Sequence, residues 1–317
     1  MTAIFLVTGP IFLLIALGFA TARTGLLSRS DFAALGKFVV NLALPALLFL
    51  TLARRPLADT VNVPYMAAYL AGGVALVLLA SRFLHRMAGL DVTGAAIAAM
   101  GMACPNSGFV GYPILLALYP DLAGTVLALN MAVENLAIIP LALFLAERGR
   151  HAGQEGAALK RAFSSLARSP LMLAIVAGAL WSLAGLDLPA LLIKPLDMLA
   201  AASGAASLLV IGGSLAQAGA GAFRRDALLV AAGKLVAHPV LAAVALAGFA
   251  ALGFGIADER LRIALVVSAA MPIMGIYPLL AHRFGRETPA AVALVTTTAL
   301  SLLTVNALFV FIEFARF

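Results

Sequence analysis

The segment MGMACPNSGFVGYPILLALYP, residues 100–120, places two prolines inside an otherwise apolar run. Pro105 and Pro113 each lack the backbone N–H that would donate four residues back, and each ring crowds the preceding turn, so a helix cannot pass through unbroken. In hydrocarbon the freed carbonyl groups are costly unless the break is buried in protein or lines a wet cavity. We therefore predict a substrate-facing break after Pro105. Its residues are Asn106, Ser107 and Gly108.

The same pattern appears a second time at residues 269–280, AAMPIMGIYPLL. Both stretches contain a proline, a glycine three residues later, and a Tyr-Pro pair beyond it. The opening prolines lie 167 positions apart, and an internal repeat is the simplest explanation. The two tyrosines either line the cavity or pack against neighbouring helices. The candidate site residues that these stretches add are Pro105, Tyr112, Pro272, Gly275 and Tyr277.

The composition is that of an integral membrane protein. The 317 residues are 63% hydrophobic and only 11% charged, against roughly 25% charged residues in soluble domains. The net charge of +7 does not indicate a nucleic-acid partner, because the basic residues form short clusters between apolar runs, where they set topology. The single cysteine, Cys104, excludes an internal disulfide. No catalytic, metal or cofactor motif is present, so we expect neither an enzyme nor a cofactor.

Ten apolar segments approach the roughly 20 residues that cross a bilayer. They are 4–22, 32–52, 64–84, 93–119, 122–146, 170–186, 192–218, 227–251, 261–283 and 289–312. With the N-terminus outside, 13 Lys and Arg residues fall in the cytoplasmic loops and 6 on the external side. This bias predicts a multi-pass protein of the inner (cell) membrane with both termini outside the cytoplasm.

The sequence divides into two similar halves. In the first segment, Pro10 is followed by Gly18 and Gly25, and in the sixth, Pro170 is followed at the same spacing by Gly178 and Gly185. Because each half has five spans, an odd number, the second half must enter the membrane from the opposite side. Inverted repeats with one discontinuous helix each are typical of secondary transporters. The predicted boundaries are 1–146, a cytoplasmic linker at 147–169, and 170–317.

Several polar side chains lie within the apolar segments. Asn41 precedes Pro45, and its amide either faces a cavity or forms an interhelical hydrogen bond. Glu134 and Asn130 share one helix face, and a carboxyl at this depth marks either function or a structural hydrogen bond. By the repeat, Asn135 corresponds to Ser301. The remaining candidate for ion or proton coupling is Thr297, so coupling to H⁺ or to Na⁺ stays open.

Two further polar residues occupy one face of the eighth segment. Lys234 lies near the cytoplasmic end, where its ammonium is expected to reach the interface. His238 precedes Pro239 and is interpreted as a packing residue. We therefore do not include either residue in the predicted site.

Four stretches together resemble the auxin efflux carrier family. They are NLALPALLF at 41–49, PNSGFVGYPIL at 105–115, ENLAIIPLALF at 134–144 and MPIMGIYPLL at 271–280. The resemblance extends over nearly the whole chain, and the short middle loop is similar to that of bacterial members. At the second break, Ile273 and Met274 stand where the family frequently has glutamine, which leaves backbone amides for substrate contact.

The resemblance implies an all-α fold of ten transmembrane helices in two inverted five-helix repeats, similar to bile-acid transporters and sodium/proton antiporters. Helices 4 and 9 would cross at their breaks. Helices 1, 2, 6 and 7 would form a scaffold that is often the contact of a homodimer, and helices 3–5 and 8–10 a moving transport domain. The substrate amides would be Asn41, Asn106 and either Asn130 or Asn135.

The residues also indicate the charge of the substrate. Half-helices that begin after the breaks point backbone N–H groups into the cavity, which favours an anion. With few fixed charges nearby, a small organic carboxylate fits better than phosphate, and the family implies auxin-like or malonate-like anions. The prediction is an alternating-access transporter of elevator type. The alternatives are a cation/proton antiporter and a carboxylate sensor that does not transport.

Overall fold

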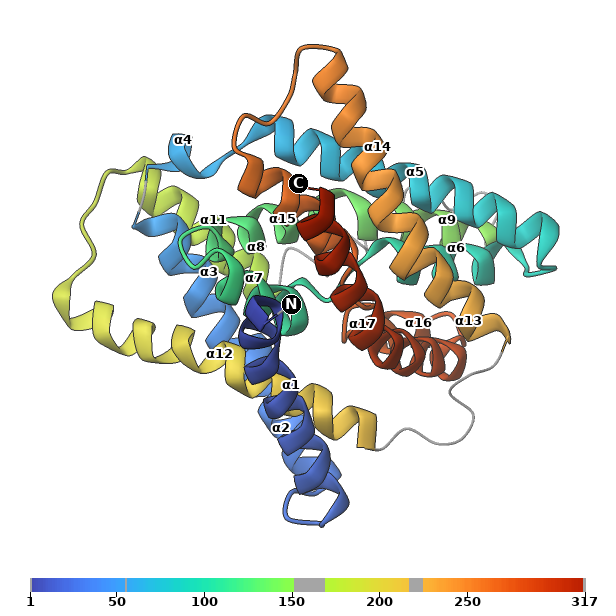
Figure 1. Ribbon diagram of the computed structural model, residues 1–317, viewed down its shortest axis with the longest axis horizontal. Coiled ribbons are helices and arrows are strands. Elements are labelled where there is room, and N and C mark those ends of the chain that lie inside the picture. Colours follow the sequence, from blue (N-terminus) through green and yellow to red (C-terminus); the bar gives the residue numbers. More distant parts are fainter. Residues whose placement is uncertain (1, 55, 151–168, 217–224, 316–317) are drawn as a thin grey trace. The chain divides into compact units, whose positions relative to one another are not determined.

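The computed structural model describes residues 2–54, 56–150, 169–216 and 225–315, and its regular secondary structure is helical (Figure 1). Among these residues the β-structure is confined to one isolated bridge. Most of the predicted linker at 147–169 lies outside the described residues. Contacts divide the chain into two compact units. Unit 1 comprises 1–62, 107–132 and 167–217, and unit 2 comprises 63–106, 133–166 and 218–317.

Unit 1 is built around helices from both halves of the sequence. Its elements are α1 (Thr2–Arg23), α2 (Arg29–Phe38), η1 (Val39–Ala43), α3 (Leu44–Ala53), α4 (Leu57–Thr60), η2 (Ser107–Gly111), α7 (Tyr112–Leu118), α8 (Ala123–Val133), α11 (Pro170–Leu183) and α12 (Ala190–Ala216). The last residue of α8 belongs to unit 2. The largest contacts in unit 1 join α1 to α12 and α11 to α3.

Glycines allow these two helix pairs to approach closely. A Cβ added at Gly18 of α1 would lie 2.2 Å from the carbonyl oxygen of Leu209 on α12, and one added at Gly178 of α11 would lie 2.8 Å from that of Phe49 on α3. Membrane helices usually carry small residues where they cross. Within a bilayer, helices associate by close backbone packing rather than by burial of apolar surface. Both α1 and α11 are followed by a glycine at positive φ, Gly25 at 76° and Gly185 at 63°.

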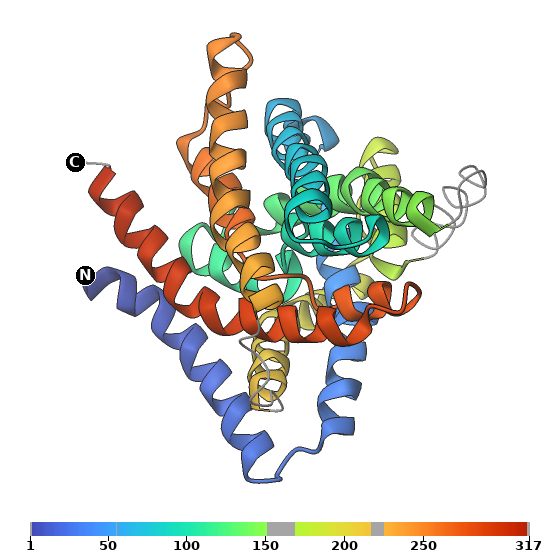
Figure 2. The ribbon, with the colours of Figure 1, turned by 90° about the vertical axis from the view of Figure 1, so that its right-hand side faces the viewer.

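Unit 2 surrounds a different core. Its elements are α5 (Val63–Met87), α6 (Val92–Ala103), η3 (Glu134–Ile138), α9 (Ile139–Arg150), α13 (Arg225–Ala232), η4 (Gly233–Ala237), α14 (His238–Ala251), α15 (Glu259–Ala269), α16 (Tyr277–His282) and α17 (Glu287–Ala315). Helix α5 packs on both α6 and α14, and α17 packs on α13 and α16 (Figures 1 and 2). Adjacent glycines on α5 admit the backbone of α14 at Gly72 and the side chain of Ile138 at Gly73.

Prolines explain the four π-helical turns, η1 to η4. Each turn ends two residues before a proline. The proline cannot donate to the carbonyl four residues back, and the residue before three of these prolines instead donates five residues back. His238, for example, donates its N–H to Gly233. The four prolines are Pro45, Pro113, Pro140 and Pro239.

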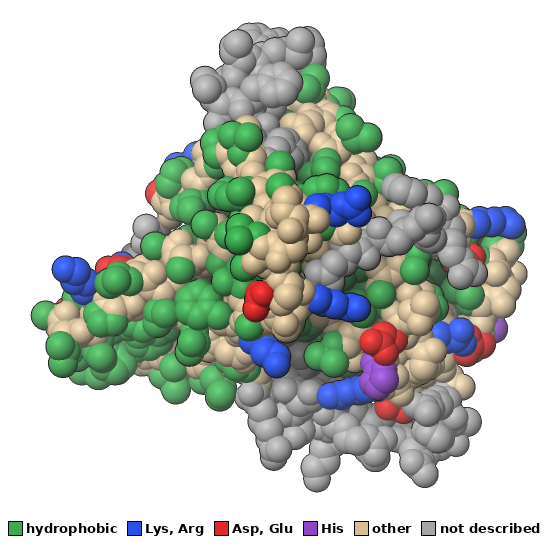
Figure 3. Space-filling view, turned by 90° about the horizontal axis from the view of Figure 1, so that it is seen from below, with side chains coloured by type: hydrophobic (Ala, Val, Ile, Leu, Met, Phe, Trp, Pro, Cys, Tyr) green, Lys and Arg blue, Asp and Glu red, His purple; other side chains and the backbone are tan. Residues whose placement is uncertain are grey.

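The helices match the predicted apolar segments, with ends that shift by a few residues. Six continuous helical stretches of the described chain are long and apolar enough to cross a membrane. Many large apolar side chains are exposed, such as Leu79, Leu180 and Leu191, and hydrophobic side chains spread over much of the face in Figure 3. In a soluble protein such a surface would be costly, so the fold is that of a multi-pass membrane protein.

We predict that Gly18→Ala lowers the free energy of unfolding by about 1–3 kcal/mol, because the new methyl group forces α1 away from α12. Thermal or denaturant unfolding of the detergent-purified protein measures this change. Gly9→Ala on the same helix is the matched control, because an added Cβ there meets no atom within 4 Å. Equal stability of the two variants would contradict the close packing.

Candidate functional site

Two extended segments of unit 2, residues 104–106 and 272–274, pair with each other through their backbones where the helices break. Helix α6 ends at Ala103, and Cys104 is extended with φ −108° and ψ 102°. Pro105 and Ile273 form an antiparallel β-bridge. The N–H of Asn106 donates to the carbonyl of Pro272 at 2.7 Å, and the N–H of Met274 donates to the carbonyl of Cys104 at 3.1 Å. Each break therefore supplies partners for backbone groups that the other leaves open.

Side chains from neighbouring helices support the second break. Thr297 of α17 accepts a long hydrogen bond, 3.5 Å, from the N–H of Ile273, and its hydroxyl is also 2.9 Å from the carbonyl of Ala293 in its own helix. The ring of Tyr277 lies against Gly101, where an added Cβ would be 2.7 Å from the ring. The predicted site residues Thr297 and Tyr277 are thus brought to the paired breaks.

A lysine is buried directly beside the second break. Lys234 is 0% exposed. Its Nζ donates to the carbonyl of Ala269 at 2.6 Å and lies 2.8 Å from Nδ1 of His238. Ala269 is the last residue of α15, so the lysine contacts the electronegative end of a half-helix. The expectation that Lys234 extends to the membrane interface is wrong, because η4 turns its side chain toward the break.

The predicted carboxyl group is buried in the same unit. Glu134 is 2% exposed, and its Oε1 accepts a 2.8 Å hydrogen bond from the hydroxyl of Tyr69. The Tyr69 ring lies 6.2 Å from the His238 ring, centroid to centroid. Cys104, whose carbonyl accepts from Met274 at the paired breaks, is also buried. We call these five residues, Tyr69, Cys104, Glu134, Lys234 and His238, the buried polar cluster.

Local backbone geometry explains how the cluster's two charged residues enter the core. Glu134 opens the π turn η3, and Lys234 is the second residue of the π turn η4. Such single π turns are frequent at functional sites in helices. The prolines that follow, Pro140 and Pro239, therefore set the position of both charges.

The remaining predicted residues of unit 2 differ in exposure. Asn135 in η3 is 6% exposed. Ser301 is 4% exposed and donates to the carbonyl of Thr298 in its own helix at 2.8 Å. Gly275 is exposed, and an added Cβ would meet no atom within 4 Å. Because Gly275 has no side chain, the backbone of the second break is accessible at this position.

Five predicted residues belong to unit 1. Asn41 is exposed, and its amide donates to the carbonyl of Lys37 at 2.8 Å. Gly108 faces the side chain of Leu44. The other three are buried: Ser107, Tyr112 and Asn130.

Sequence reasoning did not select Tyr69, Lys234 or His238 as site residues. Nothing near Tyr69 distinguishes it from other aromatic residues in apolar helices. Lys234 and His238 did carry a signal: a charged residue and a histidine four positions apart, directly before a proline, inside an apolar segment.

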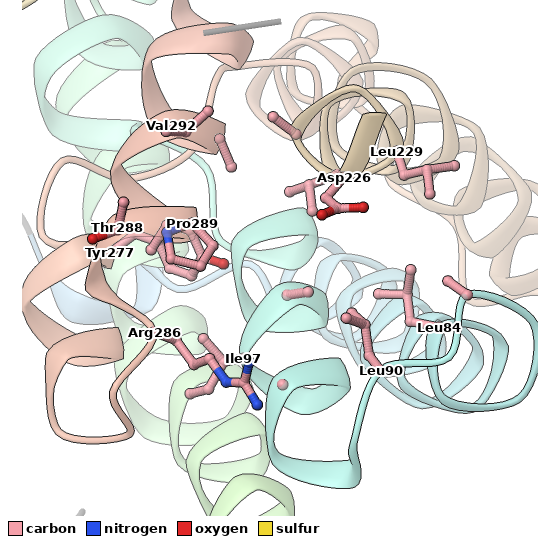
Figure 4. Close-up of a pocket in the computed structure, with 17 residues that line it drawn as sticks. Leu84, Leu90, Ile97, Asp226, Leu229, Tyr277, Arg286, Thr288, Pro289 and Val292 are labelled. Carbon is pink, nitrogen blue, oxygen red and sulfur yellow. The ribbon is translucent and has the colours of Figure 1, made fainter. Parts of the chain in front are cut away.

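A cavity of about 190 Å³ lies within unit 2 (Figure 4). Its walls are mostly apolar, with Leu84, Ile97 and Val230 among them, and Tyr277 also lines it. Arg286 and Asp226 supply its charged groups. The guanidinium of Arg286 also forms an ion pair with Asp91.

The chain is similar in sequence to known membrane transport proteins. The sequence model of the family described as membrane transport protein matches residues 4–310. A protein of Rhizobium meliloti (strain 1021) named "Putative malonate transporter" is 27% identical over 305 residues, which cover 94% of this chain and 92% of that protein. The "Uncharacterized transporter YfdV" of Escherichia coli (strain K12) is 27% identical over 219 residues, 65% of this chain and 67% of its own.

We predict that Tyr69 and Glu134 are energetically coupled. A double-mutant cycle of Tyr69→Phe and Glu134→Leu, which removes the acceptor oxygen, should give a coupling energy of about 1.5–3 kcal/mol, the range for a buried hydrogen bond to a charged group. Unfolding in detergent measures it. The control cycle combines Tyr69→Phe with Glu287→Gln, whose carboxylate pairs with exposed His282, and should be additive. Additivity in both cycles would show that the Tyr69 bond contributes nothing.

Proposed function

Because the chain belongs to the membrane transport protein family, we propose that it is a secondary transporter of small organic carboxylate anions that works by alternating access. The family match confirms the resemblance to the auxin efflux carriers and the prediction of a transporter rather than an enzyme. The R. meliloti relative named for malonate transport supports a dicarboxylate of this kind as substrate.

The observation that carries the proposal is the pair of breaks with Lys234 beside them. Within the membrane, non-helical backbone is tolerated where it is buried in protein or lines a cavity, and in transporters such a break forms part of the substrate path. The ammonium group of Lys234 makes a charged contact with the carbonyl of Ala269, just before the second break. A cation there lowers the cost of placing an anion nearby, while Asn106 offers a neutral amide, so a carboxylate is favoured over a metal cation.

The proposal includes ten spans in two inverted repeats. Its support is the repeated packing in unit 1. Helix α1 of the first half packs on α12 of the second, and α11 of the second half packs on α3 of the first. The close-approach glycine is Gly18 in one pair and Gly178 in the other, which are the positions that match in the sequence repeat.

We further propose an elevator mechanism in which unit 1 contains the scaffold and unit 2 most of the transport domain. This is supported by the division of contacts. Helices α1, α2, α3, α11 and α12 belong to unit 1, whereas α5, α13, α14, α15, α16 and α17 belong to unit 2.

Exposed apolar residues on α11 and α12, such as Leu173, Leu180 and Met198, suit contact with lipid or with a second copy in a homodimer. The proposed location is the inner membrane, with both termini outside.

We predict that malonate and related carboxylates raise the melting temperature of the purified protein, since a ligand that binds the folded state stabilises it by mass action. The measurement is a thermal-shift panel of carboxylates and inorganic phosphate, each with and without Na⁺. Stabilisation by cations alone would favour an antiporter. A carboxylate that binds but shows no flux in proteoliposomes would identify a sensor.

We also predict that Asn106→Ala weakens carboxylate binding about tenfold, equivalent to about 1.4 kcal/mol, because one amide hydrogen bond is lost. Folding should be retained, since the bond from the Asn106 N–H to Pro272 uses only the backbone. The control is Asn306→Ala on α17, where the amide donates to the carbonyl of Leu302 in its own helix. Unchanged affinity in folded Asn106→Ala would remove this side chain from the site.

A further inference from the structure

We propose that Lys234 carries the proton that couples transport, and that the cavity in unit 2 connects this lysine to water. The inference rests on the proposed function and names its coupling ion as H⁺ rather than Na⁺. Three observations support it: the hydrogen bonds of the amine, the buried groups around it, and the position of the cavity.

The hydrogen bonds of Lys234 suit both protonation states. An ammonium donates to the carbonyl of Ala269 and to Nδ1 of a neutral His238. A neutral amine keeps the bond to Ala269 and accepts from His238, if the imidazole proton is on Nδ1. Nε2 of His238 is buried and has no hydrogen-bond partner among the described residues, so no bond on that side resists the change of tautomer. Loss or gain of a proton therefore breaks neither contact.

The two direct contacts of the Lys234 amine are with a backbone carbonyl and an imidazole, and neither partner carries a fixed negative charge that would hold the amine permanently protonated. The titratable groups around Lys234 are His238 on α14, Glu134 on η3 and Cys104 after α6. Tyr69 of α5 donates to Glu134, and its ring lies near that of His238. Toward α15 and α17, the neighbouring groups are the Ala269 carbonyl and the hydroxyl of Thr297. Glu134 attracts the ammonium at longer range, and an incoming carboxylate would add to this attraction.

The cavity leads toward the lysine. Val230 lines it, and Lys234 is one turn further along the same helix, a rise of about 5–6 Å. On α17, Ala293 lines it and Thr297 is one turn further. Figure 4 shows Tyr277 on one side of this cavity, with Asp226 and Leu229 of α13 on the opposite side. Water that enters beside Asp226 and Arg286 thus reaches walls that lie one helical turn from Lys234 on one helix and one turn from Thr297 on the other.

The proposed step is a simple proton transfer. A hydronium ion in the cavity gives its proton to the lone pair of the Lys234 amine and becomes water. The resulting ammonium offsets one negative charge of the bound anion, so one proton accompanies each anion. On release of the anion, the ammonium returns the proton to water.

The first test observes Lys234 without any substrate. The chain has four lysines, Lys37, Lys160, Lys194 and Lys234, so ¹⁵Nζ NMR of lysine-labelled protein in detergent should give four resolvable signals. Replacing each lysine by arginine in turn assigns them, and the other three variants assign Lys234 if Lys234→Arg does not fold. Over a titration from about pH 5 to pH 9, we expect the Lys234 signal alone to change from ammonium to amine, because its two hydrogen bonds suit both protonation states. A signal fixed in one state over this range would overturn the inference.

The second test measures coupling in proteoliposomes with malonate as the probe and the membrane potential held at zero. For one coupled proton, a difference of about one pH unit should drive about tenfold malonate accumulation, and a Na⁺ gradient should drive none. Lys234→Arg, which cannot release its proton, should abolish the accumulation, whereas the exposed control Lys194→Arg should not. Accumulation driven by Na⁺, or by a pH difference in Lys234→Arg, would overturn the inference. Absence of any malonate flux would count against malonate as the substrate, and the NMR result would still decide the role of Lys234.

Discussion

A proline inside a membrane helix removes a backbone donor where no water can replace it, and much of this structure follows from that constraint. The chain meets it in two ways. At Pro105 and Pro272 the helices stop, and the two open segments bond to each other. At the prolines that follow the π turns, the helices continue, because the preceding residues shift their hydrogen bonds by one position.

The electrostatics of unit 2 follow from the broken helices. A helix that stops inside the protein leaves carbonyl groups without donors at its C-terminal end, and that end carries partial negative charge. Lys234 meets this end of α15 with a buried ammonium or amine. The fold thereby holds a titratable nitrogen next to the only extended backbone pairing found in the described chain. In the proposed mechanism, the same residue also serves transport.

The helical segments and the two breaks could be predicted from sequence, because hydropathy and proline act locally. The repeat spacing indicated that Pro105 and Pro272 are equivalent, but their direct pairing needed the three-dimensional structure. Glu134 was found because a carboxyl in an apolar segment is conspicuous. Lys234 was misjudged because its distance from the end of the segment suggested an interfacial position, whereas its direction depends on the π turn. Tyr69 had no signal, since its role comes only from contact with Glu134.

The π turns also shift the periodicity with which side chains recur along the helices. A π turn contains one residue more than an α turn, and each residue advances a helix by about 100°. The side chains after η1, η2, η3 and η4 are therefore rotated by roughly a quarter of a circle relative to an uninterrupted helix. A helical wheel drawn through such a segment loses its phase at the turn. Alignments of related chains should accordingly tolerate single-residue insertions or deletions at these four places more readily than elsewhere in the same helices.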